Sequence, residues 1–363
     1  PDIRLELIAG GDNWNPLLQS TLRDAVANNL PDATWQNLTY ANILASRNII
    51  VPLDDLFGDI HVLEEMGLSR PMIESTKIDG KVFGIPFGTT IPALFWNMNL
   101  LRKAGYQNGT PPEEWEEIFE IGTKVAELGS GINGGFVEYD STNAWIFQNL
   151  LASRGGRMVN GREIAFNSPE GLEALETLSR FGDINNIRMS KSQARQAFDA
   201  GVTGVQFRSA SGTASVSKAV NGSFDLQVGR FPMSSANGQL VGAGHGFFMF
   251  TRNPARQKAV WAFMKYISGP EGQLILSQNS GYMPINLLAL QDRRFRDEYL
   301  KVNPLHGGII DGLSITSDQY SFPSDNTVKI FDMMIEECRQ VVEHSKMPES
   351  ALRTMAKETE KLL

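Results

Sequence analysis

The sequence predicts a two-domain α/β protein, and three observations support this class. The chain has 363 residues, well beyond the roughly 150 residues of an ordinary domain. Hydrophobic residues make up 42% of it and charged residues 20%, the balance of a globular protein with full cores. Short apolar runs alternate with segments of helical spacing, which is typical of α/β architecture. Because no low-complexity linker divides the chain, we expect several chain crossings between the domains.

The individual elements follow from apolar periodicity and from turn residues. Period-two alternation predicts strands, spacing of three and four predicts helices, and Asp79-Gly80 is typical of a tight hairpin turn. Gly105 and the Pro-Glu pairs after Thr110 and Ser168 mark helix ends and starts. We predict strands at 3–8, 33–35 and 91–96, a hairpin at 77–86, and helices at 16–29, 40–46, 98–104, from 110–115 onward, and at 167–180.

Composition excludes several functional classes. The net charge of −8 and the lack of any long Lys/Arg block argue against nucleic-acid binding. No apolar run approaches the roughly 18 residues that a membrane-spanning helix needs. Residues 1–15 lack the basic start and apolar stretch of a signal peptide, although a mature secreted chain has already lost that segment.

Metal and thiol chemistry are also not expected. The single cysteine, Cys338, lies among apolar residues at helical spacing, so we interpret it as a buried small hydrophobe. The four histidines (His61, His245, His306 and His344) show no metal-ligand spacing. We therefore predict no metal and no cofactor.

Enzyme motifs are incomplete. Arg208-Ser-Ala-Ser-Gly212 lacks the first glycine of a hydrolase nucleophile elbow, and Gly242–Gly246 lacks the third glycine of a dinucleotide fingerprint. A pair of catalytic carboxylates is defined by distance in space, so Glu138 and Asp140 keep a carbohydrate-active enzyme open as an alternative. A chemosensory binding module is a second alternative.

Ten segments carry a resemblance to a known family. In chain order they are Gly84-Ile-Pro-Phe-Gly-Thr-Thr90, Leu100-Leu-Arg-Lys-Ala-Gly105, Pro111-Pro-Glu-Glu-Trp115, Phe166-Asn-Ser-Pro-Glu-Gly171, Phe198-Asp-Ala-Gly201, Ser209-Ala-Ser-Gly212, Val241-Gly-Ala-Gly-His-Gly246, Ala262-Phe-Met-Lys-Tyr-Ile267, Pro270-Glu-Gly272 and Ser280-Gly-Tyr-Met-Pro-Ile285. Their order and spacing over about residues 1–290 resemble the extracellular solute-binding proteins of carbohydrate importers. The likeness is strongest to the glycerol-3-phosphate-binding and maltose-binding group.

The resemblance implies a two-lobed periplasmic-binding-protein fold of type II, with the ligand in a cleft between the lobes. It implies an N-terminal lobe of residues 1–90 plus 244–290 and a C-terminal lobe of residues 91–243 plus 291–363. Crossings are expected near 89–93, 242–246 and 287–295. Family members carry a strand and a long helix before the segment matching residues 1–6, so we expect the sequence to be an incomplete record.

The resemblance also implies a function without catalysis. We expect a monomer that captures a sugar, polyol or polyol phosphate and delivers it to the permease of an ATP-driven (ABC) importer. Its expected location is the periplasm, or the cell exterior with a lipid anchor.

Polyols and sugars need flat rings for their C–H faces and short polar groups for their hydroxyls. Loops after predicted strands and at the predicted crossings supply both kinds of group. The predicted ligand-binding residues are Trp14, Trp35, Gln36, Asn37, Thr89, Thr90, Ser209, Ser211, Gly244, His245 and Tyr282. We assign Trp96, Trp115 and Trp261 to cores, and leave Trp145 unassigned.

Two positions depart from the glycerol-phosphate group. Pro323 stands where that group has a phosphate-gripping arginine, and Asn37 aligns with one of its pocket acids. Phosphate recognition usually relies on a bidentate arginine. Arg208 could replace it, and the alternative for Arg208 is a surface ion pair.

Overall fold

The computed structural model describes residues 3–10, 14–161, 163–184, 189–302, 305, 309, 312, 315–324 and 326–363. The chain forms two compact units. The first contains Pro1–Thr89 and Ala243–Val302, and the second contains Thr90–Gly242 and Asn303–Leu363. The chain thus passes between units after Thr89, after Gly242 and after Val302. The first two passages lie within one residue of the expected lobe boundaries.

The third passage comes later than the sequence suggested. Residues 291–302 belong to the first unit, whereas we expected them with the C-terminal lobe. Two contacts explain the difference. Arg294 forms an ion pair of 2.7 Å with Glu271, and the buried Tyr299 donates a hydrogen bond to the carbonyl oxygen of Ser277. The segment therefore packs against the helix that precedes it.

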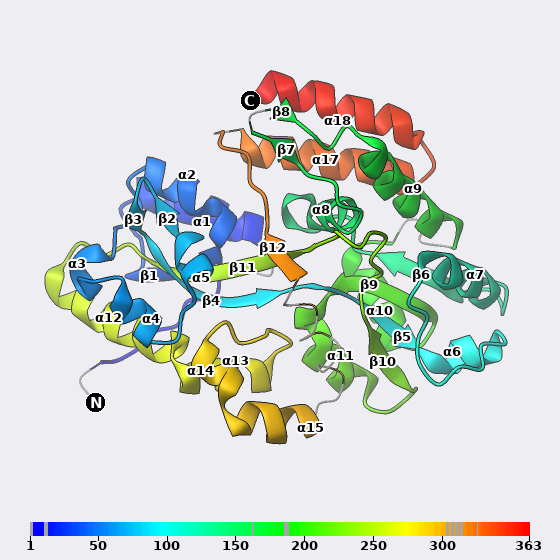
Figure 1. The fold of residues 1–363 in the computed structure, drawn as a ribbon, viewed down its shortest axis with the longest axis horizontal. Helices are drawn as coiled ribbons and strands as arrows, with labels where there is room; N and C mark the ends of the chain where they lie inside the picture. Colours follow the sequence, from blue (N-terminus) through cyan, green and yellow to red (C-terminus); the bar gives the residue numbers. More distant parts are fainter. Residues whose placement is uncertain are drawn as a thin grey trace. The chain divides into compact units, whose positions relative to one another are not determined.

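The first unit combines a small sheet with short helices (Figure 1). β1 pairs antiparallel with β11, and β4 also pairs with β11. Its elements are α1 (Trp14–Val26), β1 (Ala33–Asn37), η1 (Leu38–Tyr40), α2 (Ala41–Ser46), α3 (Asp54–Phe57), α4 (His61–Glu65), α5 (Arg70–Glu74), β2 (Lys77–Ile78), β3 (Lys81–Val82), β4 (Gly84–Thr90), the later part of β11 (Leu240–Met249), α12 (Pro254–Ser268), α13 (Pro270–Asn279), α14 (Leu287–Gln291), the π-helix η4 (Arg294–Tyr299) and α15 (Leu300–Val302).

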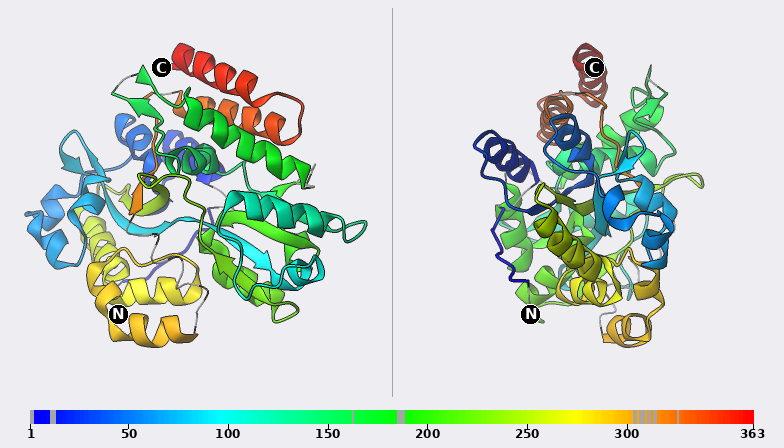
Figure 2. Two further views of the ribbon diagram at one scale, coloured as in Figure 1. Left: turned by 45° about the vertical axis from the view of Figure 1, so that its right-hand side comes forward. Right: turned by 90° about the vertical axis from the view of Figure 1, so that its left-hand side faces the viewer.

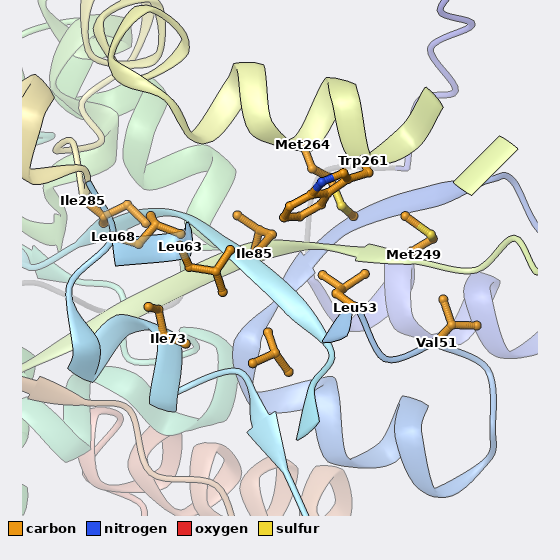
Figure 3. Packing of buried hydrophobic residues seen from close by; sticks show 11 residues of the cluster. Val51, Leu53, Leu63, Leu68, Ile73, Ile85, Met249, Trp261, Met264 and Ile285 are labelled. Carbon is orange, nitrogen blue, oxygen red and sulfur yellow. The ribbon is translucent and has the colours of Figure 1, made fainter. Parts of the chain in front are cut away.

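The core of the first unit lies between α12 and the sheet. Trp261 and Met264 of α12 face Ile85 of β4 and Met249 of β11 (Figure 3). Trp261 is only 7% exposed, which confirms its expected packing role. The hairpin of β2 and β3 is confirmed as well, with Asp79 and Gly80 both at positive φ in its turn.

The strand expected at residues 3–8 is not formed. These residues have no regular structure, and Ile3, Leu5, Leu7 and Ile8 are 48–88% exposed. Alternation of apolar and polar residues stabilises a strand only when a neighbouring strand supplies hydrogen bonds and cross-strand contacts. None of the described strands pairs with this segment.

The second unit is built on a four-stranded sheet of order β10-β5-β9-β6. β9 runs antiparallel to β5 and parallel to β6, and residues 240–242 of β11 pair parallel with β12. Its elements are β5 (Pro92–Asn97), α6 (Met98–Lys103), α7 (Trp115–Ala126), β6 (Asn133–Val137), η2 (Thr142–Ala144), α8 (Trp145–Ala152), β7 (Val159–Asn160), β8 (Glu163–Ile164), α9 (Pro169–Asp183), α10 (Lys191–Asp199), β9 (Thr203–Ser209), η3 (Ala210–Gly212), α11 (Thr213–Val220), β10 (Leu226–Gly229), β12 (Thr316–Asp318), α17 (Thr327–Val342) and α18 (Pro348–Leu362).

Helices cover this sheet and form a second layer, in which α17 and α18 pack against α9 (Figure 2). Trp96 and Trp115 are buried in the unit as expected, and Cys338 is fully buried in α17. Trp145 is buried too, and its indole N–H donates to the carbonyl oxygen of Val241 at 2.7 Å. The helix expected after Thr110 begins only at Trp115. Within the described part of the chain, no helix has the length and apolar character to cross a membrane.

Candidate functional site

An aromatic cluster forms where β1 and β11 pair in the first unit. The register places Trp35 opposite Phe247 and Asn37 opposite His245. Residues two apart on a strand share a face, so Trp35 and His245 come together on one side of the sheet. We use the name aromatic cluster for the set Trp14, Trp35, Phe87, His245, Phe247 and Tyr282.

The rings of the cluster are in contact at favourable angles. Trp14, at the start of α1, stacks on His245 with 5.7 Å between ring centroids and meets Trp35 edge-on at 5.8 Å. Tyr282 meets His245 edge-on at 4.3 Å. Trp14, Trp35 and Tyr282 are each partly exposed. The cluster therefore presents aromatic surface to solvent above a buried imidazole.

His245 is held as a neutral hydrogen-bond donor. The indole N–H of Trp35 donates to Nδ1 of His245, so Nε2 carries the proton of the neutral ring. Burial lowers the pKa of His245 to about 3. Nε2 is buried and has no hydrogen-bond partner among the described residues. It lies against Gly88, where a Cβ atom would come within 3.0 Å of it.

Four other predicted residues of the first unit have structural contacts. Asn37 is buried, and its Oδ1 accepts hydrogen bonds from the backbone N–H of Thr39 at 2.9 Å and from its hydroxyl at 2.7 Å. Strand alternation places Gln36 on the opposite face from Trp35. The backbone oxygen of Thr89 accepts from Met283 N–H at 3.3 Å, and Gly244 approaches Leu38.

The three remaining predicted residues form a hydroxyl cluster in the second unit, defined as Thr90, Ser209 and Ser211. The oxygens of Thr90 and Ser209 lie 2.9 Å apart, and those of Ser209 and Ser211 lie 2.7 Å apart. The backbone N–H of Ser211 donates to the Thr90 hydroxyl at 3.0 Å. Pairing of β5 with β9, which sets Pro92 opposite Ser209, brings Thr90 to this turn.

A buried ion-pair network includes Arg208, the neighbour of Ser209. Glu138 accepts two hydrogen bonds from Arg195, at 2.7 and 2.8 Å, and lies 3.5 Å from Nε of Arg208. The Arg208 side chain is only 7% exposed, so the expected surface ion pair is instead a buried one. Glu138 is thus engaged by two arginines, while Asp140 lies 3.8 Å from Lys191.

Sequence reasoning missed several members of both groups. Phe87 and Phe247 complete the aromatic cluster, and Arg195 completes the ion-pair network. Phe247 follows His245 by two residues, so strand alternation was the signal for it. Arg195 carried no signal, because only tertiary packing brings α10 to Glu138. Pro323 is exposed, and His306 lies outside the described residues.

Solved structures share this fold over nearly the whole chain. UgpB from Mycobacterium tuberculosis, in complex with glycerophosphocholine, covers 100% of this chain and 91% of its own, with a TM-score of 0.87 and 18% identity. Maltose-bound MalE3 from T. maritima covers 100% and 93%, with a TM-score of 0.84 and 19% identity. The fold is therefore that of the two-domain periplasmic sugar-binding proteins.

Sequence comparison then gives the family. Residues 2–299 match the bacterial extracellular solute-binding proteins, and this chain belongs to that family. The sn-glycerol-3-phosphate-binding periplasmic protein UgpB of Agrobacterium fabrum is 25% identical over 240 residues, which are 63% of this chain and 54% of the relative. Its counterpart in Rhizobium meliloti is 24% identical over 275 residues, which are 72% and 63%. The chain thus matches a little over half to under two-thirds of the length of these relatives.

Proposed function

We propose that this chain captures a sugar, polyol or polyol phosphate for an ATP-driven importer, and that the aromatic cluster is its main contact with the solute. Family membership supports a solute-binding role. The names of the relatives and the ligands of the similar structures support the solute class: glycerol 3-phosphate, glycerophosphocholine and maltose.

The observation that carries the proposal is the combination of aromatic surface with a single oriented donor. Partly exposed rings of Trp14, Trp35 and Tyr282 can pack on the C–H faces of a sugar or polyol. The Nε2–H of His245, which has no partner among the described residues, can donate to a hydroxyl or phosphate oxygen if Trp14 moves. Few polar groups among apolar walls is the usual make-up of a small-molecule site.

The role includes partners and a location. The solute-loaded protein would dock on the transmembrane permease of the importer as a monomer, in the periplasm or outside the cell with a lipid anchor. It would catalyse no reaction. The engagement of Glu138 by Arg195 and Arg208 argues against the carbohydrate-active alternative, because it removes one candidate acid from general acid–base work.

A thermal-shift screen against sugars, polyols and their phosphates tests the proposal. A solute that binds only the folded protein raises its melting temperature in a dose-dependent way, by RT ln(1 + [L]/Kd) in free energy. Fluorescence of Trp14 and Trp35 should change over the same concentrations. Free amino acids serve as the control library. No response to any sugar, polyol or phosphate, or release of product from a glycoside mixture, would contradict the proposal.

A further inference from the structure

Arg208 has far fewer hydrogen-bond partners than a buried guanidinium normally finds. Its five N–H donors make one long hydrogen bond, 3.5 Å from Nη1 to Oε1 of Gln206. Nε makes no hydrogen bond with the described residues, although Glu138 lies 3.5 Å away. A residue that is 94% buried is expected to have its donors satisfied, and an exception points to a missing ligand or water.

The guanidinium lies directly beneath the turn that begins α11. A Cβ atom on Gly212 would lie 2.6 Å from Nη2 of Arg208, so only glycine permits this close approach. Gly212 is also the N-cap residue of α11, and no side chain caps the helix there. Uncapped backbone N–H groups and the helix dipole favour negative charge at a helix N-terminus.

The hydroxyl cluster adds a donor at the same turn. Thr90, Ser209 and Ser211 have three hydroxyl protons, and the two contacts between their oxygens use two of them. The remaining proton has one long internal acceptor, the carbonyl oxygen of Ile91 at 3.4 Å from the Thr90 hydroxyl. Ser209 and Ser211 are partly exposed, so a solute can reach them.

We propose that the carboxyl end of β9 is a subsite for a tetrahedral oxyanion, formed by Arg208, the N-terminus of α11 and the hydroxyls of Ser209 and Ser211. The group that it would take is the phosphate of a phosphorylated polyol. This inference rests on the proposed solute-binding function and narrows it to an anionic solute. It also gives the chain a phosphate-binding arginine, although Pro323 is exposed and offers none.

The charges around Arg208 are compatible with an added anion. Arg195 satisfies both carboxylate oxygens of Glu138, which leaves Arg208 as the less engaged of the two arginines. Asp199, at the end of α10, is the other nearby carboxyl, and burial raises its pKa. Burial also lowers the pKa of Arg208, so a bound anion would stabilise its charged form.

Titration of the full chain with inorganic phosphate, followed by phosphorus NMR, tests the subsite directly. Calorimetry with glycerol 3-phosphate and with glycerol then measures what the phosphate contributes. We expect the phosphorylated polyol to bind at least about tenfold more tightly, the effect of one charge-assisted hydrogen bond. Arg208→Gln should abolish that preference and the phosphate binding, and Ser211→Ala should reduce both.

Arg180→Gln is the matched control, because Arg180 forms an exposed ion pair with Glu116 in the same unit. It should keep phosphate binding unchanged. Circular dichroism checks that each variant folds, and Ser211→Ala keeps the test decisive if Arg208→Gln does not. A wild-type protein that ignores phosphate but binds a neutral sugar would overturn the subsite and leave the solute-binding function standing, with buried water as the partner of Arg208. Binding of no solute at all would instead refute the function.

Discussion

The aromatic cluster of the first unit and the hydroxyl cluster of the second unit solve different physical problems. In the aromatic cluster, rings pack edge-to-face around a neutral imidazole whose orientation Trp35 fixes. In the hydroxyl cluster, short polar side chains share protons above a buried, poorly satisfied guanidinium. The first stores its stability in packing, and the second holds unused hydrogen-bonding capacity. A site can thus be rigid in one region and electrostatically ready in another.

The largest expected difference between the clusters is in stability. Trp35→Ala removes a ring that contacts five neighbours (Trp14, Phe87, His245, Phe247 and Tyr282). We expect it to lower the free energy of unfolding by about 3 kcal/mol, the lower end for large aromatic truncations because the side chain is only partly buried. Ser209→Ala removes a hydroxyl that caps η3 and should cost about 1 kcal/mol.

Denaturant unfolding of both variants measures these costs. Trp35→Phe is the control, since it retains a ring but loses the N–H that donates to His245. Its cost should fall between those of the other two variants. Equal costs for Trp35→Ala and Ser209→Ala would show that packing does not distinguish the clusters.

The second expected difference is in pH dependence. The pKa of His245 is about 3 in the folded protein, below the roughly 6.5 of an unfolded chain. Between these values the unfolded state binds the additional proton, so His245 makes stability fall as the pH falls from about 6.5 towards 3. The slope contributed by this one group approaches about 1.4 kcal/mol per pH unit within that window.

Melting temperatures of the wild type and of His245→Gln, compared at matched pH values from 7 down to about 4, isolate the contribution of His245. The wild type should lose stability faster on acidification, because the variant lacks the titrating group. Parallel curves would mean that the imidazole is not buried in its neutral form. Ser211→Ala, which removes no titratable group, should follow the wild type.

The smallest expected effect concerns which solutes each cluster recognises. Tyr282→Ala should weaken binding of a neutral sugar and of a phosphorylated polyol alike, by about two- to tenfold, because it removes an aromatic contact worth about 0.5–1.5 kcal/mol. Ser211→Ala should weaken only the phosphorylated polyol. Calorimetry with the two solutes measures both effects.

Tyr266→Ala is the control for Tyr282→Ala, since Tyr266 is 56% exposed on α12 and belongs to neither cluster. It should leave both affinities unchanged. Loss of affinity for the neutral sugar in Ser211→Ala, equal to that in Tyr282→Ala, would remove the proposed division of labour between the clusters.

The sequence by itself determined the elements whose signals are local, and the class of protein. Asp79-Gly80 fixed the hairpin because both residues tolerate positive φ in its turn. Ser168 and Pro169 fixed the start of α9, where Ser168 caps the helix. The ordered motifs between Gly84 and Ile285 identified the solute-binding family, which the sequence comparison confirms. Alternation at residues 3–8 misled, because a strand depends on partners that its own sequence does not contain.

Only the tertiary structure decided which predicted residues meet. Trp35 and His245 are 210 positions apart in the chain, and the register of β1 on β11 joins them. The same register turned Gln36 to the other face, although it is adjacent in sequence. Arg208 was ambiguous between surface and site until packing placed it beneath Gly212 and beside Glu138. Burial, pairing register and the satisfaction of buried charges depend on contacts between distant segments, and no local pattern of residues encodes them.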